Sequence, residues 1–163
     1  MEVVGILGNF VLSSSNQATR RGVFLGRRST KVHVALYRWS RGRLGARLPG
    51  WPRARILLLD HLGAKSGIRR TSPVMFHPDG DAVAVAASKG GQPVHPAWFH
   101  NLLAHPDTTI QIGSQVRPVR ARLADDAERA RLWPEFVALF PGFDSYRRQA
   151  EQRTIPIVLL EPR

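Results

Sequence analysis

The sequence predicts an α+β fold built on an antiparallel β-barrel. Three observations support this: short strand-like runs separated by turn residues, hairpin-length connections between most of them, and few intervening helices. The scarcity of helices between strands argues against a doubly wound parallel sheet. A length of 163 residues suits one domain with a short appendage. With 43% hydrophobic and only 22% charged residues, the chain is not intrinsically disordered.

The N-terminal segment is expected to lie outside the barrel. We expect residues 1–29 to form a flexible extension and residues 30–163 to form the domain. Residues 3–12 are apolar but lack the positive start of a secretory signal, and residues 13–30 are rich in Ser, Gly and Arg, which is typical of a linker. No apolar run approaches the ~18 residues of a membrane span.

A basic amphipathic helix is predicted at about residues 31–44. Its apolar stripe consists of Val32, Ala35, Leu36 and Trp39, and its basic residues Lys31, Arg38 and Arg41 lie off that stripe. Two interpretations stay open. The stripe packs on the domain, or the helix lies on an anionic membrane surface.

The remaining elements follow from apolar runs and turn residues. A continuous apolar run from residue 56 predicts a buried strand, followed by strands at 71–77 and 82–87. Asp79 and Gly80 supply the positive φ of a hairpin turn between the last two. Residues 96–104 form a short helix, because proline stands at its entry and after its end.

The C-terminal half repeats this alternation of strands and helices. Strands at 108–112 and 116–123 flank the Gly113-Ser114 turn. A helix over 125–139 begins at Asp125, with Glu128 placed to complete a capping box. A short helix at 144–152 and a last strand at 155–161 complete the order α-βββ-α-ββ-α-α-β.

The charge of the chain is concentrated near its N-terminus. The formal net charge is +12. Residues 1–55 carry eleven Lys and Arg against one acid, a net charge of +10, whereas residues 56–163 carry thirteen against eleven, a net charge of +2. A charge of this size indicates an acidic partner: nucleic acid, an anionic membrane or a polyanionic cofactor. No helix-turn-helix or RNA-binding signature accompanies it.

Several enzyme classes are excluded by residue type. The chain has no Cys, which rules out disulfides, zinc–thiolate sites, iron–sulfur clusters and cysteine nucleophiles. It lacks a dinucleotide-binding G-x-G-x-x-G, a serine-hydrolase G-x-S-x-G and a zinc-binding H-E-x-x-H. His95 and His100 stand five residues apart, on different sides of a helix, so we expect no metal site there.

Two loops at strand ends carry cations between glycines. The first spans residues 63–73 and contains Lys65 and Arg70. The second spans 86–91 and ends in Lys89-Gly90-Gly91. Such loops present backbone N–H groups and cations to phosphate or carboxylate, although each alone is typical of a solvated turn. Together they favour one shared polyanionic ligand. Trp98 and Asn101 share a helix face, where Trp98 either walls an aromatic cofactor or belongs to the core.

Five motifs in the sequence resemble those of a known enzyme family. The motifs are GAKSGIRRTSPVMF (63–76), VAASKGGQPVHPAWFHNLLAHP (85–106), ARLW (130–133), FPGFDSY (140–146) and RTIPIVLLEP (153–162). They resemble the deazaflavin-dependent nitroreductase and quinone reductase family, typically found in actinobacteria. The resemblance covers roughly residue 30 to the C-terminus. It implies a split β-barrel of the FMN-binding type and coenzyme F420, which carries a deazaflavin ring, a phosphate and an oligoglutamate tail.

The resemblance also implies roles for individual residues. The implied cofactor-binding residues are Lys65, Ser66, Arg70, Pro73, Val74, Met75, Ala86, Ala87, Ser88, Lys89, Trp98 and Asn101. Among them, Lys65, Arg70 and Lys89 match positions that face the phosphate and tail. Ser88 or a backbone N–H is the expected donor to the acceptor oxygen. Tyr146 is expected to close the acceptor pocket or to deliver a proton.

The implied activity is hydride transfer from reduced coenzyme F420 to a quinone-like or nitroaromatic acceptor. The acceptor pocket is assigned to Phe140, Phe143 and Tyr146. Members of the family often carry Tyr at the first two positions, so Phe there favours a hydrophobic quinone over nitroimidazoles, unless both rings are core residues. The alternatives are an FMN-dependent reductase on the same barrel and a basic nucleic-acid-binding module. We expect no metal and no nucleic acid, a monomer or homodimer, and a cytoplasmic protein with peripheral contact to anionic membrane through residues 1–55.

Overall fold

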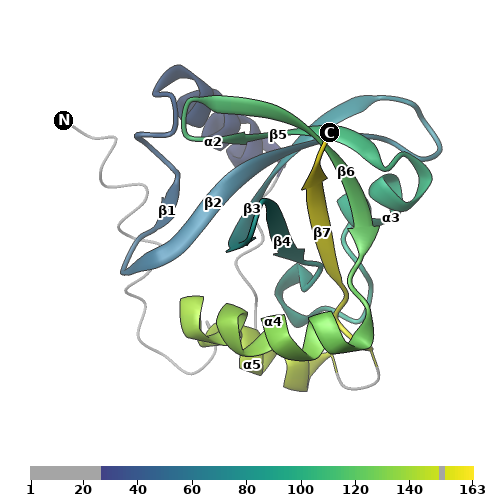
Figure 1. Ribbon diagram of the computed structural model, residues 1–163. Coiled ribbons are helices and arrows are strands. Elements are labelled where there is room, and N and C mark those ends of the chain that lie inside the picture. The colour runs from purple at the N-terminus through teal and green to yellow at the C-terminus, as the bar shows by residue number, and fades with distance from the viewer. Residues whose placement is uncertain (1–26, 151–152) are drawn as a thin grey trace.

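A computed structural model describes residues 27–150 and 153–163. It contains a seven-stranded antiparallel sheet in the order β1-β2-β3-β4-β7-β6-β5 (Figure 1). Pairing of β2 with β5 closes the last six strands of this order into a barrel. The strands are β1 (Arg47–Leu48), β2 (Trp51–Leu62), β3 (Arg69–Asp79), β4 (Ala82–Ala86), β5 (Asp107–Ile112), β6 (Gln115–Leu123) and β7 (Ile157–Pro162). The predicted barrel is therefore confirmed.

The helices lie around this barrel. They are α2 (Arg27–Trp39), the short 3₁₀ helix η2 (Lys89–Gly91), α3 (Ala97–Ala104), α4 (Asp126–Leu139) and α5 (Gly142–Gln149). Figure 1 shows α4 and α5 together below the strands and α2 behind the opposite end. The predicted order of elements is confirmed, except that β1 and η2 were not anticipated and β2 begins at Trp51 rather than at residue 56. Of the predicted extension at 1–29, residues 1–26 lie outside the described residues, and 27–29 are helical.

Helix α2 corrects the expectation for residues 31–44. It ends at Trp39, because the chain turns at Arg41 and Gly42, both with positive φ. The interpretation that the apolar stripe packs on the barrel is wrong, since Val32 is 59% and Trp39 80% exposed. Tyr37 faces the barrel instead. Its hydroxyl donates to the Ile56 carbonyl at 3.0 Å and accepts from the Gly113 amide at 3.0 Å.

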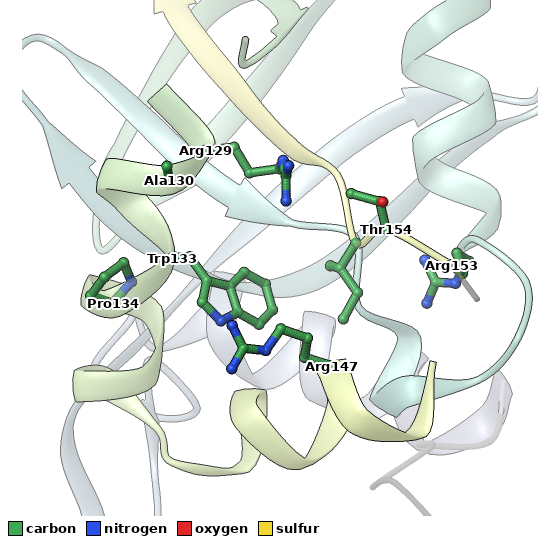
Figure 2. A pocket seen from close by; sticks show the side chains of 8 residues that line it. Arg129, Ala130, Trp133, Pro134, Arg147, Arg153 and Thr154 are labelled. Atoms are coloured by element: carbon green, nitrogen blue, oxygen red, sulfur yellow. The ribbon is translucent and has the colours of Figure 1, made fainter. Parts of the chain in front are cut away.

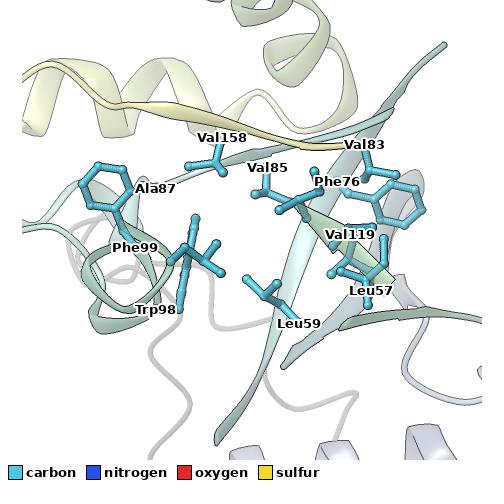
Figure 3. Close-up of a cluster of buried hydrophobic side chains, with 13 residues drawn as sticks. Leu57, Leu59, Phe76, Val83, Val85, Ala87, Trp98, Phe99, Val119 and Val158 are labelled. Atoms are coloured by element: carbon cyan, nitrogen blue, oxygen red, sulfur yellow. The ribbon is translucent and has the colours of Figure 1, made fainter. Parts of the chain in front are cut away.

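The barrel strands divide their side chains between two apolar clusters. The interior cluster takes Val83 and Val85 from β4, and Figure 3 shows it with Trp98 and Phe99 of α3 at one end. The outer cluster includes Ala84 of the same strand, Ile157 and Leu159 of β7, and side chains of α4 and α5. This alternation is the period-2 pattern of a strand that is buried on both faces.

The predicted capping box at the start of α4 is confirmed. The Asp125 side chain accepts from the Glu128 amide at 2.8 Å, and the Glu128 carboxylate accepts from the Asp125 amide at 2.9 Å. The predicted β3–β4 hairpin is also present, with Gly80 at φ +60°. No helix in the described part of the chain is long and apolar enough to cross a bilayer.

Candidate coenzyme site on the barrel

The turn between β2 and β3 and the first residues of β3 present two exposed cations. Lys65 and Arg70 are exposed, and no carboxylate among the described residues pairs with either of them. The turn is closed from within. The Gly67 amide donates to the Gly63 carbonyl at 2.8 Å, and the Ser66 hydroxyl accepts from the Ile68 amide at 3.4 Å. Ser66 therefore shapes the turn, and the two cations stay available to an anion.

A buried hydrogen-bond network ties this turn to α3. The Ala64 amide donates to Asn101 Oδ1 at 2.9 Å, so Asn101 Nδ2 is the donor to His61 Nδ1 at 2.8 Å. His61 must then carry its proton on Nε2, which donates to the Ser72 hydroxyl at 3.0 Å. Burial, followed by the nearby charge of Arg70, lowers the pKa of His61 to about 4. No sequence motif marks His61, because an isolated His on a strand has no characteristic neighbours.

The second loop leaves the end of β4 and continues into η2. Its backbone is left-handed at three successive residues, with φ +49° at Lys89, +62° at Gly90 and +77° at Gly91. A Cβ at Gly91 would lie 3.0 Å from Tyr146 Cα and from Gln149 Cβ, so only glycine lets the loop approach α5 this closely. The loop that carries Ser88 and Lys89 therefore lies directly against the helix that carries Tyr146.

The outer face of β3 and β4 meets α5 beside this loop. Met75 and Ala86 pack with Phe140 and Tyr146 against the outer cluster. Tyr146 lies 6.1 Å from the Phe140 ring and 5.8 Å from the Phe143 ring, measured between centroids. Burial raises the pKa of its hydroxyl, so Tyr146 stays protonated at neutral pH. Phe143 is only 3% exposed, which agrees with the interpretation that it is a core residue.

The predicted site residues are split between the two faces of the sheet. Val74, Ala87 and Trp98 belong to the barrel interior, and Asn101 is buried in the network with His61. Their side chains therefore lie on the interior side of the sheet, opposite the outer face. The outer face brings together Met75 and Ala86 with Phe140 and Tyr146, and the two cationic loops lie at strand ends. Pro73 lies between them on β3 and is partly buried.

A cavity among the described residues lies away from these two loops. It has a volume of about 570 Å³ between α4, α5 and the segment that leads into β7. Figure 2 shows the Trp133 ring beside the Arg147 side chain, whose guanidinium carbon lies 5.9 Å from the ring centroid, with Arg153 at the edge of the cavity. Its lining has no residue in common with the two cationic loops. The cavity is lined by Arg129, Ala130, Trp133, Pro134, Arg147, Arg153, Thr154 and Ile155.

Comparison with known proteins supplies the family. A family model described as F420H(2)-dependent quinone reductase matches residues 29–162. The chain belongs to the F420H(2)-dependent quinone reductase family. A relative from Mycobacterium tuberculosis that is provisionally named for the same activity is 48% identical over 107 residues, covering 66% of this chain and 89% of its own. The F420H(2)-dependent quinone reductase Rv1261c from the same species is 38% identical over 135 residues, covering 82% and 89%.

A solved structure agrees with this assignment. The F420-H2 dependent reductase FDR-A is 36% identical, with a TM-score of 0.60, and the match covers 65% of this chain and 93% of that one. The resemblance to F420H(2)-dependent quinone reductases is thus confirmed for the fold and the family. The donor set described above suits their coenzyme, because unpaired cations at one loop and a left-handed, cationic loop at another fit a ligand with phosphate and carboxylate groups.

Proposed function

We propose that this protein reduces a quinone with reduced coenzyme F420, on the outer face of β3 and β4 between the two cationic loops. The family match over residues 29–162 carries the proposal. The site geometry supports it, because the loop of Ser88 and Lys89 lies against the helix of Tyr146. The same match favours coenzyme F420 over FMN as the cofactor.

In this proposal the cations hold the anionic part of the coenzyme. Lys65 faces the phosphate and tail from the β2–β3 turn, Arg70 from the start of β3, and Lys89 from η2. Arg70 can bind a phosphate with two parallel N–H donors, which a lysine cannot do. Met75 and Ala86 supply the apolar surface against which the ring lies, and Asn101 fixes the first loop through the Ala64 amide.

The reaction needs one hydride and one proton. When bound, the reduced coenzyme supplies the hydride, which carries two electrons. A quinone that accepts it becomes a hydroquinone after taking up one proton at oxygen. Tyr146 holds a proton at neutral pH because burial raises its pKa, and it is the proposed donor. The Ser88 hydroxyl is the proposed hydrogen-bond donor to the second quinone oxygen, where negative charge develops.

The acceptor class follows from the rim of the site. Phe140 is partly buried, lies 5.4 Å from the Trp51 ring and packs beside Tyr146. This rim is apolar and holds few hydroxyls to bind a nitro group. A hydrophobic quinone therefore suits the rim better than a nitroimidazole.

Titration of the full-length protein with oxidised coenzyme F420 tests the binding step. We expect tryptophan quenching in the micromolar range, weakened about tenfold or more by Arg70→Ala and by Lys89→Ala. Arg43→Ala is the matched control, since Arg43 is an exposed cation on the connection after α2. Lack of binding at tens of micromolar would overturn the proposal, and release of a yellow flavin on denaturation would instead indicate FMN.

Substitution of the two hydroxyl residues tests the chemical step. Tyr146→Phe and Ser88→Ala should each lower kcat with a short-chain benzoquinone by about tenfold or more while leaving the coenzyme Kd within about twofold. Steady-state kinetics with reduced coenzyme F420 measures both constants. An unchanged kcat in Tyr146→Phe would assign the proton to solvent or to another group.

Helix α2 further suggests where the acceptor is met. Its exposed apolar residues Val32, Ala35 and Trp39 lie in a stretch, residues 27–55, that contains no acid. We propose that this face rests on an anionic membrane, in which a lipid-soluble quinone resides. Basic residues attract the lipid headgroups, and Trp39 inserts at the interface.

Sedimentation with liposomes tests this contact. The full chain should pellet with vesicles that contain phosphatidylglycerol and stay in the supernatant with pure phosphatidylcholine. Trp39→Ala should reduce pelleting, whereas replacement of another exposed apolar residue, Val116→Ala on β6, should not. Equal pelleting with both kinds of vesicle would contradict the proposal.

A further inference from the structure

Arg153 lies in the segment before β7, and all N–H donors of its guanidinium form hydrogen bonds with other groups of the protein. Nε donates to the Gln92 carbonyl at 3.1 Å. One terminal nitrogen, Nη1, donates to the Ala87 carbonyl at 3.1 Å and to His95 Nδ1 at 2.7 Å. The other, Nη2, donates to the Ser88 carbonyl at 2.8 Å and to the Gln92 carbonyl at 2.9 Å. All five N–H donors of the side chain thus end on the loop of residues 87–92 or on the His that follows it.

The loop that Arg153 holds is strained. Lys89 adopts φ +49°, a left-handed backbone that is unfavourable for a non-glycine residue, and two left-handed glycines follow it. Such a backbone persists only when its surroundings determine it. The three carbonyls that Arg153 binds belong to Ala87, Ser88 and Gln92, which bracket the left-handed residues on both sides.

The positive charge of the Arg153 guanidinium lies directly against the 87–92 loop. Its five hydrogen bonds go to carbonyl oxygens and to a neutral imidazole, so none of them ends on a carboxylate. Burial lowers its pKa, yet an arginine stays charged at any physiological pH. No carboxylate among the described residues bonds to this guanidinium, so its charge beneath the loop adds to the attraction that Lys89 exerts on an anion.

We infer that Arg153 is a positioning residue that holds the 87–92 loop in its left-handed form and thereby sets Ser88 and Lys89 toward the coenzyme. This inference rests on the proposed function for the identity of the ligand, whereas the loop geometry does not depend on it. Lysine cannot replace Arg153, because a single ammonium has three donors and cannot reach three carbonyls and an imidazole arranged around a planar fork.

The first test measures the loop without any coenzyme. Amide hydrogen exchange of peptides covering residues 88–92 should be at least about tenfold faster in full-length Arg153→Lys than in wild type, while β5 and β6 exchange at the wild-type rate. Arg148→Ala, an exposed arginine on α5, is the control and should leave both unchanged. Wild-type exchange at 88–92 in Arg153→Lys would overturn the inference, whatever the coenzyme result.

The second test joins the loop to the reaction. Arg153→Ala and Arg153→Lys should raise the coenzyme Kd about tenfold and lower kcat/KM further. Added guanidinium ion at millimolar concentration should restore part of this loss in Arg153→Ala and nothing in Arg70→Ala. If wild type binds the coenzyme and both Arg153 variants bind it equally well, the inference fails. If wild type itself does not bind, the proposed function fails, and the exchange experiment alone decides the role of Arg153.

Discussion

His61 is the clearest case of a residue whose chemistry is set by burial. It is 5% exposed and sits between Asn101 and Ser72, with each ring nitrogen assigned one partner. A second proton would place two donors face to face at Nδ1. The folded protein therefore resists protonation of His61, whereas the unfolded chain accepts it near the ordinary pKa of 6.5.

This difference predicts a pH dependence of stability. Between pH 6.5 and about 4 the unfolded state binds one more proton at this site, so the free energy of unfolding falls as the pH falls through that window, by roughly 3 kcal/mol in all. Urea unfolding of wild type and His61→Gln at pH 7.5 and 4.5 measures it. The gap between the two proteins should shrink or reverse at the lower pH. A gap that stays the same at both pH values would rule out this origin.

Single residues also mark the limit of prediction from sequence. Lys65, Arg70 and Lys89 could be chosen because cations between glycines have a recognisable local pattern. His61 and Arg153 could not, because Asn101 lies 40 residues from His61 and His95 lies 58 residues from Arg153, and no local pattern records such contacts. Trp98 and Asn101 were recognised as a shared helix face, but only the fold shows that this face points into the barrel.

Among the elements, η2 is packed closely against α5 at Gly91. Gly91 and Gly80 have similar backbones, with φ +77° and +60°, but a Cβ at Gly80 would meet nothing within 4 Å. Alanine at either position imposes the left-handed penalty of about 1–2 kcal/mol. At Gly91 it also pushes the loop away from Tyr146 and Gln149.

Alanine substitutions at Gly80 and Gly91 therefore distinguish the cost of backbone strain from the cost of losing the close contact with α5. Gly80→Ala should lower the free energy of unfolding by about 1–2 kcal/mol and leave coenzyme binding unchanged. Gly91→Ala should lower it further and weaken coenzyme binding at least about fivefold. Urea unfolding and fluorescence titration measure the two quantities. Equal behaviour of both variants would mean that the approach of η2 to α5 is unimportant.

Element boundaries were predictable where a local signal exists. The capping box at Asp125 and the Asp-Gly hairpin are each specified by about four consecutive residues, and both are present. Helix α2 was misjudged because its apolar stripe looked like a packing face, whereas the barrel takes up Tyr37, a residue outside that stripe. A single aromatic hydroxyl with two backbone partners anchors this helix, and periodicity does not reveal such an anchor.

For the whole molecule, closure of the barrel rests on a short seam. Strands β2 and β5 pair at Leu58 with Gln111 and at Leu59 with Ile110. Leu59 and Ile110 are both buried in the interior cluster, so apolar packing reinforces the few hydrogen bonds there. The alternation of side chains along each strand was predictable, but the pairing of two strands about 50 residues apart was not.

Loss of packing at this seam should strongly destabilise the fold. Leu59→Ala should lower the free energy of unfolding by about 2–5 kcal/mol, because it leaves a cavity where the barrel closes. Leu103→Ala removes the same atoms from an exposed position on α3 and should change it by less than about 0.5 kcal/mol. Chemical denaturation measures both. A small effect at Leu59 would show that the barrel closes without this contact.

The place of β7 has a consequence for synthesis of the protein. This strand comes last along the chain, yet it lies between β4 and β6 and contributes to both apolar clusters. While the ribosome is still making residues 157–162, β4 and β6 each expose an unpaired edge and neither cluster is complete. The nascent chain thus carries two open edges until its final strand emerges, and it depends on chaperones during that interval more than a barrel closed by an early strand would.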